Sequence, residues 1–333
     1  MSHNMNIENL QVKAEVIKAI RAWFDNQGFI EMHTPRMVAL PGQEPYLEPC
    51  WLDVKRQTSN VKCRVALVTS PEYAMKKLLG AGLDKIYDLG PCFRDNEPWD
   101  GSHDPEFLML EWYRRNAGVN ELMDDVLNLL TFVISKQRNS KFEIRNSIKK
   151  MTVEEVWRVY AGVELAPLLE NREAMAKLAS EKFGQTVTDQ DDWDDIYYKI
   201  FLSEIEPKIE AGEPMFLYRY PASMAALARK SEDDSRWADR VEFYAGGLEL
   251  ANGFAELSDP VEQRKRFEEE QNLRRRSGKE VWSIDEELLN ALPKMGNAAG
   301  IAFGVDRLVM LVTGAKSIND VIPFSARDRL GKN

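Results

Sequence analysis

The sequence of 333 residues predicts a mixed fold of helices and strands, α/β or α+β, as one domain with a helical insert. Residues 7–27 carry apolar side chains at helical spacing, and Gly28 follows as a helix-ending glycine. Residues 86–94 and 107–113 have the pattern of two strands joined by a polar loop. Gly246 and Gly247 separate two short apolar segments, which indicates a β-hairpin.

The remaining elements are expected in chain order. A strand at 29–34 ends before Pro35, and another covers 65–69. Ser70-Pro71-Glu72 is typical of a helix start, with a serine cap, proline at the first helical position and an acidic first turn. The rest of the chain is expected to hold a mostly helical insert at 119–210, strands at 216–220, 241–244 and 248–250, a charged helix at 261–276, and a turn at 300–307 before an apolar helix.

Composition excludes several classes of function. With 44 basic and 54 acidic side chains, the net charge of −10 argues against broad nucleic-acid binding. The three cysteines, Cys50, Cys63 and Cys92, have neither the number nor the spacing of a disulfide framework or a zinc site. No signal peptide and no membrane-length apolar run is present, so we expect a cytoplasmic protein without a membrane partner.

The segment from Arg94 to Tyr113 contains the most informative pattern. At the two-residue period of a strand, Phe107, Met109, Glu111 and Tyr113 share one face. If the hairpin closes, Arg94 comes within reach of that face, which would suit a site for a phosphate, a base and an amine. The alternative is a sheet with an ordinary polar exposed face.

The glycine hairpin supports a geometric argument about two carboxylates. A two-residue turn places Ala245 opposite Leu248, so Glu242 and Glu249 become diagonal neighbours on one face. Such a pair suits a magnesium ion, which takes one or two carboxylates together with substrate phosphates. The alternative is a pair of exposed glutamates balanced by basic neighbours such as Arg240.

Asn252, Phe254 and Glu256 share a face among themselves, but strict alternation places them opposite Glu249. A pocket that includes both needs a bulge, and Gly253 is well placed to supply one. Downstream, the small residues of 300–307 allow a close backbone approach to a ligand, with Arg307 at the start of a helix. A tight structural turn with a solvated arginine is the alternative.

Taken in order, these segments resemble the three signature motifs of class II aminoacyl-tRNA synthetases. Residues 28–35 resemble motif 1, the dimer-interface element, and Phe93-Arg94 through Phe107 and Tyr113 resemble motif 2. Residues 304–308, Gly-Val-Asp-Arg-Leu, resemble motif 3. The resemblance implies an α+β catalytic core, an antiparallel sheet flanked by helices, over residues 7–330.

Within that class the lysine subgroup matches more closely, through residues 70–72, 105–107 and 249–256. No anticodon-binding domain is expected ahead of the first helix, so the chain resembles the short paralogues of lysyl-tRNA synthetase, the elongation factor P–(R)-β-lysine ligase family. This resemblance implies ATP-dependent activation of (R)-β-lysine or lysine, transfer to a lysine of elongation factor P, and a homodimer through motif 1. The alternatives are a stand-alone core that aminoacylates tRNA or another acceptor, although tRNA is not expected as a partner, and a non-enzymatic binding module.

The resemblance also implies roles for individual residues. Arg94, Arg307 and Glu249 would act in catalysis, and Glu242 and Glu249 would hold Mg²⁺. The ATP site would be formed by Arg94, Asn96, Glu97, His103, Asp104, Phe107, Glu249, Leu250, Gly304 and Arg307. The amino acid would be held by Ser70, Pro71, Glu72, Glu111, Tyr113, Asn252, Phe254, Glu256 and Ala302.

Four positions depart from the family pattern. The motif 2 loop is one residue longer, which leaves open whether Asn96 or Glu97 takes the role of the family glutamate. Asp104 and Ala255 replace the usual side chains, and the loop 41–49 matches poorly. Ala302, by contrast, resembles the ligase family. The tRNA enzymes tend to have glycine there, and the extra methyl group would be expected to change which lysine isomer fits.

Overall fold

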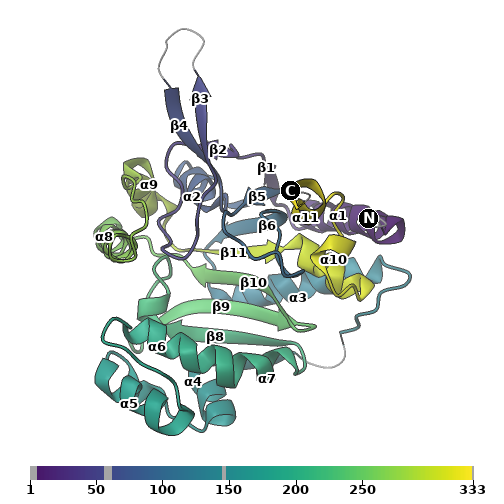
Figure 1. Ribbon diagram of the computed structural model, residues 1–333. Coiled ribbons are helices and arrows are strands. Elements are labelled where there is room, and N and C mark those ends of the chain that lie inside the picture. The colour runs from purple at the N-terminus through teal and green to yellow at the C-terminus, as the bar shows by residue number, and fades with distance from the viewer. Residues whose placement is uncertain (1–5, 56–61, 145–147, 332–333) are drawn as a thin grey trace. The chain divides into compact units, whose positions relative to one another are not determined.

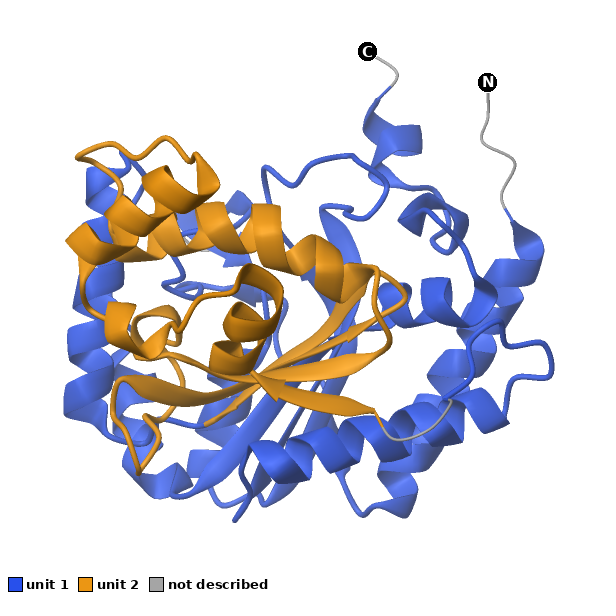
Figure 2. Cartoon of the chain, turned by 90° about the horizontal axis from the view of Figure 1, so that it is seen from below, with its two compact units in different colours: residues 1–144, 256–333 blue, residues 145–255 orange. Residues whose placement is uncertain are grey.

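The structure, a computed structural model, describes residues 6–55, 62–144 and 148–331. The chain forms two compact units (Figure 2): residues 1–144 with 256–333, and residues 145–255. The first unit therefore comes from both ends of the chain. The predicted insert at 119–210 begins in the first unit and continues in the second.

The main sheet of the first unit carries motifs 1, 2 and 3 (Figure 1). Its strands lie in the order β1 (Ile30–Met32), β5 (Lys85–Phe93), β6 (Glu106–Arg115) and β11 (Ala298–Gly304). β5 pairs antiparallel with β6, and β6 with β11, whereas β1 and β5 are parallel. The predicted α+β fold is confirmed, with the correction that its sheet is mixed rather than wholly antiparallel.

The first unit also contains seven described α-helices, of which α1 packs against the sheet. Asn6 caps α1, accepting a hydrogen bond from the Asn9 backbone N–H at 3.2 Å, and Gly28 follows the helix with φ of 73°. Phe24 of α1 stacks on Tyr87 of β5, with ring centroids 4.4 Å apart. The α-helices are α1 (Ile7–Asn26), α2 (Glu72–Gly80), α3 (Val119–Ser135), α8 (Pro260–Arg276), α9 (Glu286–Met295), α10 (Val305–Thr313) and α11 (Ala326–Leu330).

The start of α2 differs from its predicted form. Pro71 is the N-cap rather than the first helical residue, and the helix begins at Glu72. The Ser70 hydroxyl still accepts a hydrogen bond from the Glu72 N–H at 3.0 Å, so it satisfies one free donor of the first turn. A small separate sheet lies before α2, with strands in the order β2 (Met37–Val38), β4 (Lys62–Leu67) and β3 (Trp51–Lys55).

The second unit contains four described strands and has its own core. Its strands follow the order β10 (Leu248–Ala255), β9 (Trp237–Ala245), β8 (Met215–Pro221) and β7 (Lys149–Thr152), and only the β7–β8 pair is parallel. Buried aromatic side chains such as Trp157 and Tyr197 form its core. Its helical segments are α4 (Val153–Val156), a π-helical turn at Trp157–Ala161, α5 (Arg172–Phe183), α6 (Trp193–Ile200), a second π-helical turn at Phe201–Ile205, and α7 (Glu206–Glu210).

The glycine hairpin between β9 and β10 has the predicted register. Leu248 pairs with Ala245 and Glu249 with Tyr244, and both turn glycines have positive φ, as a two-residue hairpin turn requires. The predicted bulge is also present, but it lies between Glu249 and Ala251 and not at Gly253. After the bulge Asn252 pairs directly with Glu242.

Candidate active site

Carboxylates from three separate segments of the first unit meet in one buried cluster. Glu111 lies on β6, Glu72 in the first turn of α2, and Glu256 immediately after β10, where its N–H donates to the carbonyl of Ala298 at 2.8 Å. Their exposed fractions are only 2%, 8% and 1%, and that of Tyr113 is 2%. The alternative of an ordinary exposed polar face on β6 is therefore wrong.

Lys76 completes this cluster and was missed in the sequence. Its ammonium lies 2.7 Å from Glu256 Oε2, and it pairs with Glu72 one helical turn earlier. Burial opposes the charge of Lys76, but the carboxylates of Glu256 and Glu72 outweigh it and raise its pKa. The four-residue spacing from Glu72 on a predicted helix was the available signal. The contact with Glu256, 180 residues away, was not available.

Glu111 receives hydrogen bonds from two neutral groups. Ser70 donates its hydroxyl to Glu111 Oε2 at 2.7 Å, and the Tyr113 hydroxyl donates to Oε1. Burial raises the pKa of Glu111 to about 8, and the nearby charge of Glu72 adds to this. Burial also raises the pKa of Glu256 to about 8, although Lys76 acts in the opposite direction.

One oxygen of the cluster lacks a donor. Glu256 Oε1 is buried without a hydrogen-bond partner among the described residues. A β-carbon added at Gly300 of β11 would come within 2.7 Å of this oxygen and would overlap the Tyr113 ring. The glycine thus keeps open the space beside an unsatisfied carboxylate oxygen, and this arrangement suits a ligand that brings an ammonium group.

Arg94 follows β5 and lies over an aromatic ring of β6. Its guanidinium carbon is 5.0 Å from the centre of the Phe107 ring, which is close enough for a cation–π contact. The Arg94 backbone N–H donates to Pro105 at 3.0 Å, which closes the motif 2 hairpin as predicted. Its Nε is a buried donor without an acceptor in the described chain. A phosphate oxygen would satisfy this donor, so the residues fit an ATP phosphate.

The motif 2 loop directs a second group of side chains toward Arg307 of α10. Arg307 Nη2 lies 3.2 Å from His103 Nε2, and the same ring nitrogen is 4.0 Å from Glu97. Asn96 is exposed and has φ of 58°, a left-handed conformation that asparagine tolerates well. Of these two residues, Glu97 therefore lies beside His103, whereas Asn96 occupies an exposed position of the loop.

Two buried aspartates near this group hold the backbone. Asp104, predicted to line the ATP site, accepts hydrogen bonds from Ala326 N–H at 2.7 Å and Glu106 N–H at 3.1 Å. Asp306 accepts from Leu108 N–H at 2.7 Å and pairs with Lys13 of α1. Asp306 thus fixes the start of α10, and with it Arg307, against β6.

The second unit holds the other predicted site residues. After the bulge, Asn252 and Phe254 follow Glu249 on β10, whereas Leu250 is buried. Phe254 packs against a group of small buried alanines. Asn252 Oδ1 accepts a hydrogen bond from Arg240 Nε at 3.1 Å.

Glu242 does not fit a magnesium ligand. Arg240 Nη2 lies 2.5 Å from its Oε1, and the hydroxyls of Tyr244 and Tyr220 both donate to its Oε2, the former at 2.7 Å. The carboxylate is balanced by Arg240, as in the alternative given in the sequence analysis, but it is buried, with only 6% exposed. In the described part of the chain, no three histidine, cysteine or acidic side chains lie close enough together to hold a metal ion.

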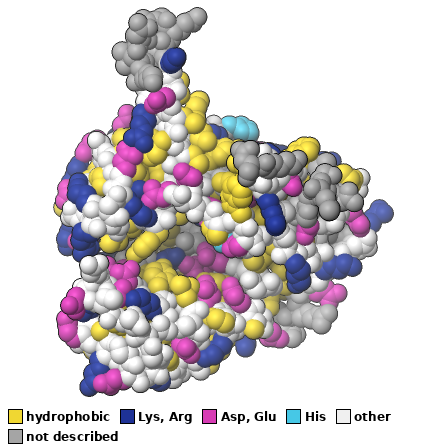
Figure 3. All heavy atoms as spheres, in the orientation of Figure 1, with side chains coloured by type: hydrophobic (Ala, Val, Ile, Leu, Met, Phe, Trp, Pro, Cys, Tyr) yellow, Lys and Arg dark blue, Asp and Glu magenta, His cyan; other side chains and the backbone are white. Residues whose placement is uncertain are grey.

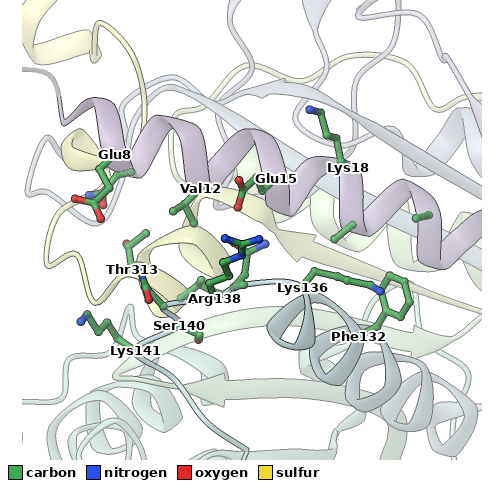
Figure 4. A pocket seen from close by; sticks show the side chains of 16 residues that line it. Glu8, Val12, Glu15, Lys18, Phe132, Lys136, Arg138, Ser140, Lys141 and Thr313 are labelled. Atoms are coloured by element: carbon green, nitrogen blue, oxygen red, sulfur yellow. The ribbon is translucent and has the colours of Figure 1, made fainter.

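A cavity of about 800 Å³ elsewhere in the first unit contains none of the predicted site residues (Figure 4). Side chains of α1, among them Glu8, Val12 and Glu15, face the segment after α3, which contributes Arg138 and Lys141. Neither the acidic cluster nor Arg94 lines it. No described helix combines the length and apolarity needed to cross a membrane.

The chain was compared with known proteins. A family model described as "tRNA synthetases class II (D, K and N)" matches residues 1–328. The chain is 37% identical to a protein named elongation factor P–(R)-β-lysine ligase from Photorhabdus laumondii, over 96% of this chain and 95% of that protein. Proteins of the same name from Yersinia enterocolitica and Avibacterium paragallinarum are 37% and 36% identical, each over 96% of this chain and 95% and 96% of their own lengths. The resemblance inferred from the motifs is confirmed, and the chain belongs to the class II tRNA synthetase family.

Proposed function

We propose that the protein is a ligase that activates (R)-β-lysine or lysine with ATP and transfers it to a lysine side chain of elongation factor P. The observation that carries this proposal is the buried cluster of Glu72, Glu111 and Glu256, which has an unsatisfied carboxylate oxygen beside Gly300. A substrate ammonium supplies the donor that the cluster lacks. The names of the relatives support elongation factor P as the acceptor.

In the first step, the substrate carboxylate attacks the α-phosphorus of ATP, an aminoacyl-adenylate forms, and pyrophosphate leaves. Arg94 would neutralise charge on the phosphate, with the adenine against Phe107. Arg307 and His103 would bind the rest of the triphosphate region, with Glu97 beside His103. In the second step, the amine of the acceptor lysine attacks the acyl carbon and AMP leaves. No side chain forms a covalent bond, so catalysis depends on positioning and electrostatics.

The remaining predicted residues keep their proposed roles with two changes. Ala302 pairs directly with Glu111 across β11 and β6, so its methyl group would limit which lysine isomer fits. Ser70 orients Glu111 through its hydroxyl, and Pro71 and Gly304 contribute backbone. The earlier proposals also stand for four residues of β10, with Glu249 and Leu250 binding ATP and Asn252 and Phe254 binding the amino acid. Asp104 becomes a structural residue, and Glu242 is withdrawn as a metal ligand.

Aminoacylation of tRNA has less support. The sequence feature that would favour RNA is a pair of basic stretches in α8, at residues 264–266 and 274–276, and several of their arginines are engaged within the protein. Arg264 pairs with Glu286 at 2.5 Å, Arg266 with Glu262 at 3.1 Å, and Arg274 is fully buried. Acidic and basic side chains are interspersed over the face shown in Figure 3. Because we propose elongation factor P as the acceptor, we also propose a cytoplasmic location.

The test offers both acceptors to the same enzyme. With ATP and (R)-β-lysine, we expect radiolabel to be incorporated into elongation factor P and not into bulk tRNA. Replacing the acceptor lysine of elongation factor P with arginine is the control, and it should abolish the incorporation. Labelling of tRNA at a comparable rate would refute the proposed acceptor, and absence of amino-acid-dependent pyrophosphate exchange would refute the proposed activation.

We also propose a homodimer through motif 1. β1 is an edge strand of the sheet in the first unit, and its Ile30 side chain is 51% exposed. An exposed apolar side chain on an unpaired edge suits an interface. Ile30→Asp is expected to convert a dimer to a monomer in light scattering, whereas Leu202→Asp, at an equally exposed position of the second unit, should not. A dimeric Ile30→Asp variant would contradict this interface.

A further inference from the structure

The loop at 41–49, which departs from the family pattern, is held firmly in the first unit. Arg274 of α8 donates from Nη1 to the carbonyls of Glu44 and Leu47, both at 3.0 Å, and from Nη2 to Glu48 Oε2 at 2.9 Å. The N–H of Asp95, next to Arg94, donates to the Glu48 carbonyl at 2.8 Å. The loop is thus fixed both to α8 and to the motif 2 hairpin.

Glu44 is the acidic side chain that this loop directs toward the start of α2. A small cavity of about 30 Å³ is lined by Glu44 and Glu72, together with Gly42, Ser70 and Pro71. A cavity of this size holds about one water-sized group. A β-carbon on Gly42 would overlap the Glu44 carboxylate, so the glycine permits that conformation.

The electrostatics of the cavity favour a cation. Burial raises the pKa of Glu44, and the charge of Glu72 raises it further, while Arg94 and Lys76 lower it. Within the described residues the Glu44 carboxylate forms no ion pair. Lys76 is already shared by Glu72 and Glu256, so one lysine serves several carboxylates. Together with the unsatisfied Glu256 Oε1, this leaves room for positive charge from a ligand.

We propose that Glu44, together with Glu72, holds one of the two ammonium groups of a diamino acid, while Glu111 and Glu256 hold the other. This inference rests on the proposed function and adds a specificity-determining residue to it. The two groups would select substrates that carry two amines at a fixed separation. The ammonium on carbon 2 of lysine, or on carbon 3 of β-lysine, would enter the small cavity.

The experiment compares ligands with two amines and with one. Pyrophosphate exchange gives KM for (R)-β-lysine and for L-lysine, and inhibition of exchange gives Ki for 6-aminohexanoate, which lacks the amine nearer the carboxylate. For Glu44→Gln we expect KM for the preferred isomer to rise about tenfold to a hundredfold, the usual size of a lost charged hydrogen bond. Ki for 6-aminohexanoate should stay within about twofold.

Glu48→Gln is the matched control in the same loop, because Glu48 is held by Arg274 and Lys279 and does not line the small cavity. If Glu48→Gln disturbs the loop, KM for the amino acid and Ki for 6-aminohexanoate should rise together. The inference is overturned if Glu44→Gln raises both constants by the same factor, or neither. In those cases wild-type exchange still supports the proposed function, whereas absence of wild-type exchange with either isomer refutes that function and this inference with it.

Discussion

Arg94→Ala is expected to lower the rate of aminoacyl-adenylate formation by a factor of about 10² to 10³, the typical cost of losing one preorganised electrostatic contact to a transition state. The Arg94 guanidinium contacts the Phe107 ring and keeps a buried Nε donor without an acceptor. A buried guanidinium donor that has no acceptor can stabilise the negative charge of a bound phosphate. Pyrophosphate exchange at saturating amino acid measures the effect.

Two further variants separate charge from geometry. Arg94→Lys keeps the positive charge but not the planar set of donors, so we expect it to recover only part of the lost rate. Arg64→Ala removes an exposed arginine that pairs with Glu280, and exchange should stay close to wild type. Wild-type exchange in Arg94→Ala would contradict the assignment of this residue to the phosphate.

Several strands could be predicted because the information for them is local. The period-two pattern of 107–113 predicts a strand and the side chains that share its face, and the glycine pair 246–247 predicts the register of its hairpin, which was found. The parallel pairing of β1 with β5 depends on residues more than 50 positions apart, such as Ile30 and Ile86, and no local pattern encodes it. A bulge was expected only for a pocket that includes both Glu249 and Asn252, and its place is not at the one glycine of the strand.

The same distinction applies to the site. Glu72, Glu111 and Glu256 were predicted through motifs, but the motifs do not tell how many charges compensate them. Lys76 and Glu44 acquire their roles only from contacts with distant segments. Glu242 shows the reverse case. Its pairing with Arg240 was the simpler alternative, and local strand geometry was sufficient to predict it.

Lysine affinity is expected to rise with pH between about 6 and 8, because burial raises the pKa of Glu111 and of Glu256 to about 8. Near pH 7 the two carboxyls retain protons, and an ammonium ligand binds the ionised form, so binding must release protons. The dissociation constant should fall by up to about tenfold per pH unit for each proton released. Calorimetry in buffers of different ionisation enthalpy counts these protons directly.

The stability of the unliganded protein should fall as pH rises over the same range. A carboxyl whose folded pKa lies above its unfolded value of 4.5 stabilises the fold most below that value, and the contribution is lost as pH rises through the folded pKa. The thermal midpoint should therefore fall between pH 6 and 8, and lysine should restore more of it at pH 8 than at pH 6. Glu256→Gln should reduce both the fall and the proton release, whereas Glu287→Gln, whose side chain is 88% exposed, should change neither. Equal proton release by wild type and Glu256→Gln would contradict this account, since the protons would then come from groups outside the acidic cluster.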